Sequence, residues 1–182
     1  MSTTEEILAL YRQTLMPTYS PSLVLVRGRG ARVWDSEGKE YLDFLAGIAV
    51  NALGHCHPRV VRAIRRQAGR LMHVSNLYCN DVTPTLAAAL LSRSFPGGKC
   101  FFCNSGAEAN EGMIKLARLW GSSAGKYEVI SMTNSFHGRT LATIAATGQT
   151  KYQKGFEPMP EGFKYAEFNG LDSVRSALTD KT

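Results

Sequence analysis

The spacing of apolar residues changes along the chain, and the change comes near residue 50. Before it, residues 4–14 carry apolar side chains at helical intervals, and three strand-like runs follow at 23–26, 32–34 and 41–45. Sequences typical of tight turns join these runs. This order predicts a helix followed by an antiparallel meander, which is too small to fold alone and must pack on other segments.

After residue 50, helical and strand-like segments alternate, which predicts an α/β fold with a mostly parallel sheet. We therefore place a domain boundary near residue 50, between the helix and meander of residues 1–50 and the α/β pattern of residues 51–182. In such sheets, ligands lie beyond the carboxyl ends of the strands. The predicted helices are 58–72, 81–94, 105–120, a short one ending near 146 and one capped by Asn169, and the predicted strands are 99–103, 127–133 and 163–168.

The composition is that of an ordinary globular protein. Of the 182 residues, 44% are apolar and 20% are charged, as in typical soluble domains. No apolar run reaches the roughly 18–20 residues of a membrane span. Residues 1–6 are polar and acidic, unlike a secretory signal or an arginine-rich transit peptide. We therefore expect a cytoplasmic protein without a membrane partner.

The net charge of +6 is scattered, except for a group of arginines in the helix predicted at 58–72. These arginines cover one broad helix face opposite the apolar positions, and neither aromatic residues nor a nucleic-acid motif accompany them. A solvated helix face explains the pattern better than a nucleic-acid surface, so no nucleic-acid partner is expected. The group consists of Arg62, Arg65, Arg66 and Arg70.

The cysteines raise the question of a metal site. Cys100 and Cys103 have a zinc-like spacing, and His55 and His57 lie upstream. Two phenylalanines fill the gap between the cysteines, however, as in a buried strand. Buried thiols are therefore favoured over a metal site, and without a secretion signal disulfides are not expected. The four cysteines are Cys56, Cys79, Cys100 and Cys103.

Residues 101–111 have the pattern of a strand, a tight turn and a helix start. A helix start aims free backbone N–H groups and the positive end of the helix dipole at one point, where a phosphate is a common occupant. Gly106 and Ala107 have little side chain, so an anion can approach their N–H groups, and Ser105 adds a hydroxyl. From the residues alone, helix capping by Asn104 or Ser105 is as good an explanation as phosphate binding.

Residues 134–140 form a second turn between a predicted strand and a predicted helix. Phe136 offers an aromatic face on which a planar ring could stack, and Arg139 can bind a carboxylate through two parallel hydrogen bonds. His137 is more typical of structural hydrogen bonding than of catalysis. On local grounds alone, a core or lid position for Phe136 is the stronger interpretation.

Taken together, these stretches resemble a known enzyme family. The segments 104–111, 135–140 and 43–58 are similar to motifs of the class III pyridoxal-phosphate aminotransferases, and the similarity extends from about Tyr19 to Leu178. The ornithine, succinylornithine and 4-aminobutyrate branches of that class share most of the pattern. Shorter stretches resemble the acetylornithine branch in particular, at 47–50, 75–78 and 146–149.

The resemblance implies a fold and a set of site residues. It implies the N-terminal part of a fold-type I pyridoxal-phosphate-dependent transferase, which is a homodimer with sites at the subunit interface. In that fold, residues 1–50 are an N-terminal arm with a small-domain segment, and residues 51–182 are the first part of the cofactor-binding large domain. Gly106 and Ala107 then donate N–H groups to the cofactor phosphate beside Ser105, Phe136 stacks on the pyridine ring, and Arg139 binds the substrate α-carboxylate. The implied reaction moves an amino group from N2-acetylornithine, or a related ω-amino donor, to 2-oxoglutarate in arginine biosynthesis.

The resemblance also implies two groups that this sequence lacks. The family needs a lysine that forms a Schiff base with the cofactor and a carboxylate on the pyridine nitrogen, both from a later part of the chain. No lysine here matches that context, so no catalytic residue is assigned, and we expect an N-terminal portion that is inactive alone. A non-catalytic fragment or binding module remains the main alternative, and a metal-binding regulator built on the cysteines and histidines has far less support.

Overall fold

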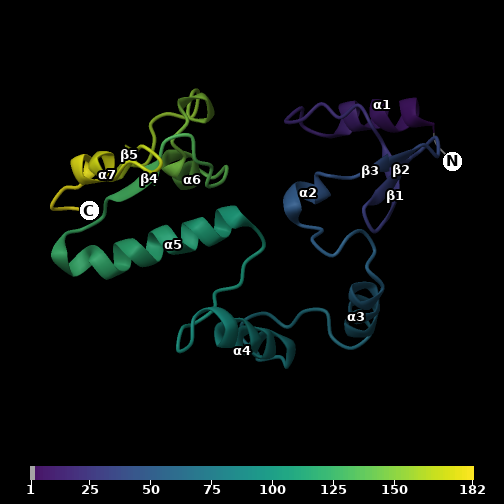
Figure 1. The fold of residues 1–182 in the computed structure, drawn as a ribbon, viewed down its shortest axis with the longest axis horizontal. Helices are drawn as coiled ribbons and strands as arrows, with labels where there is room; N and C mark the ends of the chain where they lie inside the picture. The colour runs from purple at the N-terminus through teal and green to yellow at the C-terminus, as the bar shows by residue number, and fades with distance from the viewer. Residues whose placement is uncertain (1–2) are drawn as a thin grey trace. The chain divides into compact units, whose positions relative to one another are not determined.

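The structure, a computed structural model, describes residues 3–182; Met1 and Ser2 of the predicted N-terminal segment lie outside it. The chain divides into two compact units, Met1–Asp81 and Val82–Thr182, and each is described by itself (Figure 1). The boundary expected near residue 50 concerns the domains of a complete fold and stays a prediction.

The first unit begins with the predicted helix and meander. Helix α1 starts with a capping box, in which the N–H of Thr3 donates to Glu6 Oε2 (2.8 Å) and the N–H of Glu6 donates to Thr3 Oγ1 (3.2 Å). The three strands that follow pair antiparallel in the order β1-β2-β3, so the predicted meander is confirmed. The elements are α1 Thr4–Thr14, β1 Leu25–Arg29, β2 Arg32–Asp35 and β3 Glu40–Leu42.

Two short helices complete this unit. Helix α3 (Pro58–Ala68) begins at a proline, whose fixed φ suits the first helical position, and it ends before the predicted residue 72. Helix α2 (Ala46–Ala49) was not predicted, and its backbone lies in the left-handed region, with φ of 49° at Ala46 and 59° at Ile48. Left-handed backbone is costly for residues with a Cβ, so local sequence preference does not explain it.

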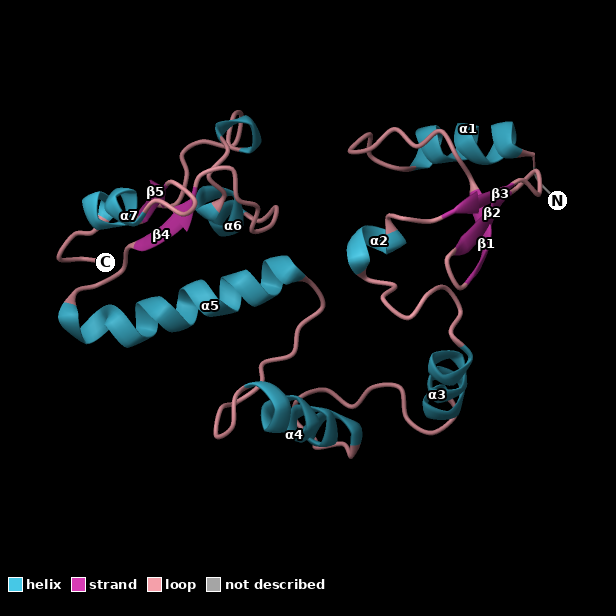
Figure 2. Cartoon of the chain, in the orientation of Figure 1, coloured by secondary structure: helices cyan, strands magenta, loops and turns pink. Residues whose placement is uncertain are grey.

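The second unit is built around a parallel pair of strands. Strands β4 (Val129–Met132) and β5 (Phe163–Ala166) pair in parallel, as predicted for this part of the chain. Helix α6 contacts both strands and helix α5, and α7 contacts β5 (Figure 2). The helices are α4 Val82–Ser94, α5 Gly106–Gly121, α6 Leu141–Ala146 and α7 Leu171–Ala177, with 3-10 turns at η1 Ser122–Ala124 and η2 Thr150–Tyr152. The core of this unit surrounds α6 and contains Ile114, Ile144, Ala145, Ala146 and Ala166.

Three expectations about this unit were wrong. Residues 99–103 form no strand, because a strand needs a neighbour to receive its hydrogen bonds, and Phe101 is instead 73% exposed. For the same reason the thiol of Cys103 is exposed rather than buried; Cys56 and Cys79 of the first unit are also exposed. Asn169 does not cap α7, whose preceding residue is Gly170 with no side-chain cap.

None of the helices within residues 3–182 combines the length and the apolar character needed to cross a membrane.

Candidate functional site

The first turn is organised by the side chains that cap α5. Ser105 precedes the helix, and its Oγ accepts a hydrogen bond from the N–H of Glu108 (3.2 Å) and donates one to Glu108 Oε2 (3.2 Å). The N–H of Asn104 donates to the same carboxylate oxygen at 2.7 Å. Hydrogen bonds from the Asn104 side chain and backbone lower the pKa of Glu108. The capping alternative for Ser105 is therefore realised, and Glu108 holds the turn in shape.

The next two residues leave an open position at the helix start. A Cβ on Gly106 would meet no atom within 4 Å. Among the described residues, no acceptor is found for the N–H of Gly106 or of Ala107. These two donors lie at the positive end of the sixteen-residue helix α5. The arrangement suits a bound anion, whereas the hydroxyl of Ser105 is already engaged with Glu108.

The second turn is tied to a buried helix. The N–H of His137 donates to Thr147 Oγ1 at 3.0 Å, and the Thr147 hydroxyl donates to the carbonyl of Thr143 at 2.8 Å. Both threonines are completely buried. Thr140 starts α6 with a capping box that it shares with Thr143. His137 is thus a structural hydrogen-bonder through its backbone, and the turn has little freedom to move.

The two predicted ligand-binding side chains of this turn are exposed. Phe136 is 55% exposed and touches the ring of Tyr152 edge-on, with 5.9 Å between the ring centroids and 74° between the planes. The core position considered for Phe136 is therefore wrong. Arg139 is also exposed, two residues before the start of α6. Both side chains are accessible to a small molecule.

The structure brings the two turns into contact. Gly138 has φ of 144°, and a Cβ there would lie 2.8 Å from the Cβ of Ala107. Only a glycine permits this close approach. The side-chain amide of Asn110, on α5, donates to the carbonyl of His137 at 2.6 Å. The open N–H groups and the exposed Phe136 and Arg139 consequently belong to one region of the second unit.

Sequence reasoning missed the residues that join the turns. Asn110 lies one turn after Ala107 on α5, and Ile114, one turn further, is buried. An amide on a buried helix face needs a hydrogen-bond partner, which is a signal that the sequence contains. The carboxylate of Glu111, the next residue of α5, accepts a hydrogen bond from the hydroxyl of Thr140. Which partner each residue finds depends on the fold.

The third segment that resembles the family, 43–58, belongs to the first unit. His55 Nε2 lies 2.6 Å from Asp43 Oδ2, and the other oxygen of Asp43 accepts hydrogen bonds from the N–H groups of Leu45 and Ala46. The hydrogen bond with His55, followed by that from Ala46, lowers the pKa of Asp43. A Cβ on Gly28 would lie 2.7 Å from His55 Cγ. The Asp43 carboxylate thus fixes the backbone at the start of α2, whose residues have positive φ.

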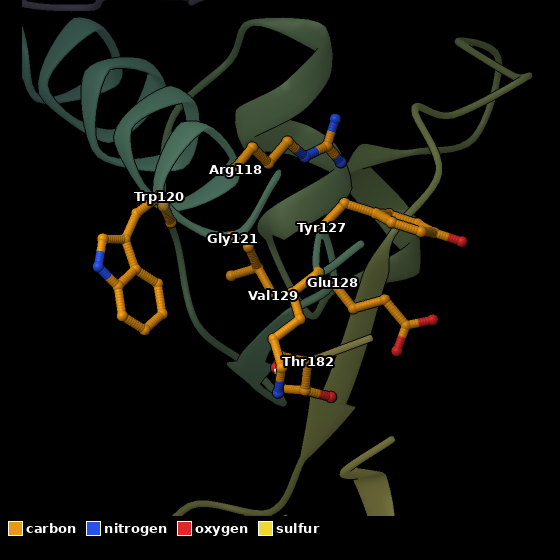
Figure 3. A pocket seen from close by; sticks show the side chains of 9 residues that line it. Arg118, Trp120, Gly121, Tyr127, Glu128, Val129 and Thr182 are labelled. Carbon is orange, nitrogen blue, oxygen red and sulfur yellow. Dashed lines mark hydrogen bonds between the residues drawn. The ribbon is translucent and has the colours of Figure 1, made fainter. Parts of the chain in front are cut away.

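Two concave places in the second unit contain none of the predicted site residues. A pocket of about 130 Å³ lies between the end of α5 and the start of β4, lined by Arg118, Trp120, Tyr127 and Thr182 among others (Figure 3). A wider groove of about 750 Å³ follows the apolar face of α5, along Phe101, Met113 and Leu116. Within residues 3–182, no three His, Cys, Asp or Glu side chains are grouped to hold a metal ion.

Comparison with known proteins defines the class to which this fold and these turns belong. The family described as Aminotransferase class-III matches residues 15–179, and the chain belongs to this family. The chain is 53% identical over 174 residues to the acetylornithine aminotransferase of Caldanaerobacter subterraneus subsp. tengcongensis, covering 93% of this chain but 44% of that protein. It therefore spans less than half the length of this relative.

Solved structures agree with this assignment. The ornithine aminotransferase of Toxoplasma gondii ME49 matches with a TM-score of 0.90 and 33% identity, over 97% of this chain and 43% of that one. The N-acetylornithine aminotransferase of Stenotrophomonas maltophilia K279a matches with a TM-score of 0.74 and 38% identity, over 94% and 41%. The predicted fold class, the N-terminal part of a fold-type I transferase, is confirmed.

Proposed function

We propose that this chain is part of a pyridoxal-phosphate-dependent aminotransferase that moves an amino group from N2-acetylornithine to 2-oxoglutarate. The observation that carries the proposal is the contact between the two turns, in a chain that shares about half its residues with an acetylornithine aminotransferase. Arginine biosynthesis, a cytoplasmic location and a homodimer belong to the same proposal, as do the amino donor and 2-oxoglutarate as small-molecule partners.

The residues of the two turns fit this cofactor. The N–H groups of Gly106 and Ala107 would hold the phosphate, because no acceptor for them is found within residues 3–182 and the missing Cβ of Gly106 leaves room. The hydroxyl of Ser105 would contact the phosphate in addition to the two hydrogen bonds that it forms with Glu108. When bound, pyridoxal phosphate supplies an electron sink for bonds at the carbon that carries the amino group.

Two further side chains would orient the reactants. The ring of Phe136 is exposed for stacking on the cofactor, and Arg139, two residues before α6, would bind the α-carboxylate of the amino donor. Holding the cofactor ring and the amino donor in this way would remove much of the entropic cost of bringing them together to react. The lysine and the carboxylate that the family requires have no counterpart in this sequence, so we expect activity from a complete protein and none from residues 1–182 alone.

A panel of amino donors tests the proposal. The complete protein that contains this sequence is assayed with 2-oxoglutarate and, in turn, acetylornithine, ornithine, succinylornithine and 4-aminobutyrate. We expect the highest kcat/KM with acetylornithine, and no cofactor-dependent conversion of any donor would contradict the proposal. Ornithine is the second candidate, because the backbone matches the solved ornithine aminotransferase more closely than the solved acetylornithine enzyme.

The role of Arg139 has its own test in the same protein. Arg139→Ala should raise the KM of the amino donor at least about tenfold, since a charge-assisted contact to the carboxylate is lost. Arg175→Ala is the matched control, because Arg175 is an exposed arginine of α7 whose one ion pair within residues 3–182 is with Asp172. An unchanged KM in Arg139→Ala would remove this residue from the site.

A further inference from the structure

The peptide that follows Phe136 is held from two sides. The carbonyl of His137 accepts a hydrogen bond from Asn110 Nδ2 at 2.6 Å, and its N–H donates to the completely buried Thr147 hydroxyl at 3.0 Å. The contact from Asn110 comes from α5, while that from Thr147 comes from the end of α6. His137 lies between Phe136 and Arg139, so these two bonds set the direction of the backbone that carries both side chains.

Asn110 also lies on α5, the helix that begins at the first turn, where the phosphate is proposed to bind. It lies one helical turn beyond Ala107, against which Gly138 packs. One residue further along α5, the carboxylate of Glu111 accepts a hydrogen bond from the hydroxyl of Thr140. Consecutive turns of α5 therefore hold the second turn at Gly138, His137 and Thr140, and a helix is stiff over this length.

We propose that Asn110 is a positioning residue that sets Phe136 and Arg139 at a fixed place relative to the N–H groups of Gly106 and Ala107. This inference rests on the proposed function, and it names the structural link between the two halves of that site. Among the residues that the structure describes, Tyr152 is the one aromatic ring that contacts Phe136, and Phe136 is half exposed, so few side-chain contacts fix its ring. Its position is determined instead by the backbone that Asn110 holds.

The distance between the two turns is important for a ligand in which a short bridge links a phosphate to a ring. The phosphate and the ring must meet their partners at the same time, and a misplacement of about 1 Å is enough to weaken one of the two contacts. Loss of the Asn110 bond should therefore weaken binding of the complete ligand. Binding of inorganic phosphate, which needs only the first turn, should be preserved.

The test uses the complete protein that contains this sequence, with pyridoxamine 5′-phosphate as the probe because it has no aldehyde to react with lysines. Asn110→Asp keeps the size of the side chain but replaces the N–H donor with a second acceptor. We expect about a tenfold loss of affinity for the probe, measured by calorimetry, because a carboxylate cannot donate to the His137 carbonyl and is repelled by it. Inorganic phosphate, used as a competitor, should keep its inhibition constant within about twofold, since the first turn is intact.

The matched control is Asn169→Asp, an exposed asparagine of the same unit with φ of 60°, a conformation that Asp also tolerates. It should leave the affinity of both ligands unchanged. The induced circular dichroism of the bound ring gives a second reading, and it should change in Asn110→Asp but not in the control. Asn110→Ser, whose side chain is too short to span the contact, provides an independent variant.

The outcomes separate the inference from the proposed function. If the unmodified protein binds pyridoxamine 5′-phosphate no better than pyridoxamine, the proposed phosphate site fails and the inference fails with it. If the unmodified protein binds the probe, but both Asn110 variants bind it equally well or lose probe and phosphate together, only the inference is overturned. If both variants unfold, Asn110 is a folding residue and the positioning role is likewise rejected.

Discussion

The two turns of the candidate site differ in how they are held. The turn at the start of α5 is maintained by its own neighbours: Ser105, Asn104 and Glu108 bond to one another, and Gly106 faces open space. The turn before α6 is maintained by distant residues, through Asn110 on one side and buried Thr147 on the other. A site can thus combine a part that its local sequence forms and a part that exists only in the folded unit.

This difference predicts that glycines in the two turns have different effects. Gly138→Val should destabilise the second unit by roughly 2–4 kcal/mol, because the added atoms meet Ala107 and Thr143 and the backbone is left-handed. Urea unfolding measures the change in the free energy of unfolding. Gly155→Val is the control, since Gly155 also has positive φ, 90°, but nothing within 4 Å of its missing Cβ. Equal losses in both variants would show that backbone strain alone is responsible.

The second prediction removes the buried hydroxyl that holds the second turn. Thr147→Val keeps the shape but leaves the N–H of His137 without its acceptor, at a cost of about 2 kcal/mol in the free energy of unfolding. Thr150→Val, at an exposed position in η2, should change stability by less than about 0.5 kcal/mol. Faster hydrogen exchange at the His137 amide would localise the effect. A loss no larger than that of the control would contradict the importance of this bond.

The third prediction concerns the locally formed turn. Gly106→Ala should change the free energy of unfolding by less than about 1 kcal/mol, because the added Cβ enters open space. Its effect should fall on binding, with about a tenfold loss of affinity for pyridoxamine 5′-phosphate as the methyl group blocks the approach to the N–H groups. Isothermal calorimetry on the complete protein measures this. Strong destabilisation without a binding defect would reverse the contrast between Gly106 and Gly138.

The smallest expected effect is that of acid. The folded pKa of Glu108 is lowered, chiefly by the Asn104 side chain, so its contribution to stability is present above the ordinary value of 4.5 and is lost as the pH falls through the lowered pKa. The bonds that hold His137 do not titrate. As the pH falls, the protection of the Asn104 amide against hydrogen exchange, taken relative to the intrinsic exchange rate at each pH, should therefore be lost before that of the His137 amide. In Glu108→Gln this pH dependence should disappear, and Glu6→Gln, the capping glutamate of α1, serves as the control.

Much of the chain could be predicted from its sequence because the determinants are close neighbours. Helix α1, the meander and helices α3 to α5 follow from capping residues, turn residues and apolar periodicity, all within a few positions. The residues of both turns could be named for the same reason. The strand expected at residues 99–103 is the informative failure, since a short, mostly apolar segment becomes a strand only beside another strand, and no strand within residues 3–182 pairs with it.

By itself, the sequence determined that a helix start with small residues follows residue 104 and that Phe136 and Arg139 lie in a second turn. It also contained enough of the pattern to indicate the class III aminotransferases. Only the tertiary structure decided that Gly138 packs on Ala107 and that Asn110 donates to the carbonyl of His137. It also decided that the hydroxyl of Ser105 donates to Glu108. The physical reason is that capping depends on adjacent residues, whereas the spacing between the turns depends on contacts across 27 positions of chain.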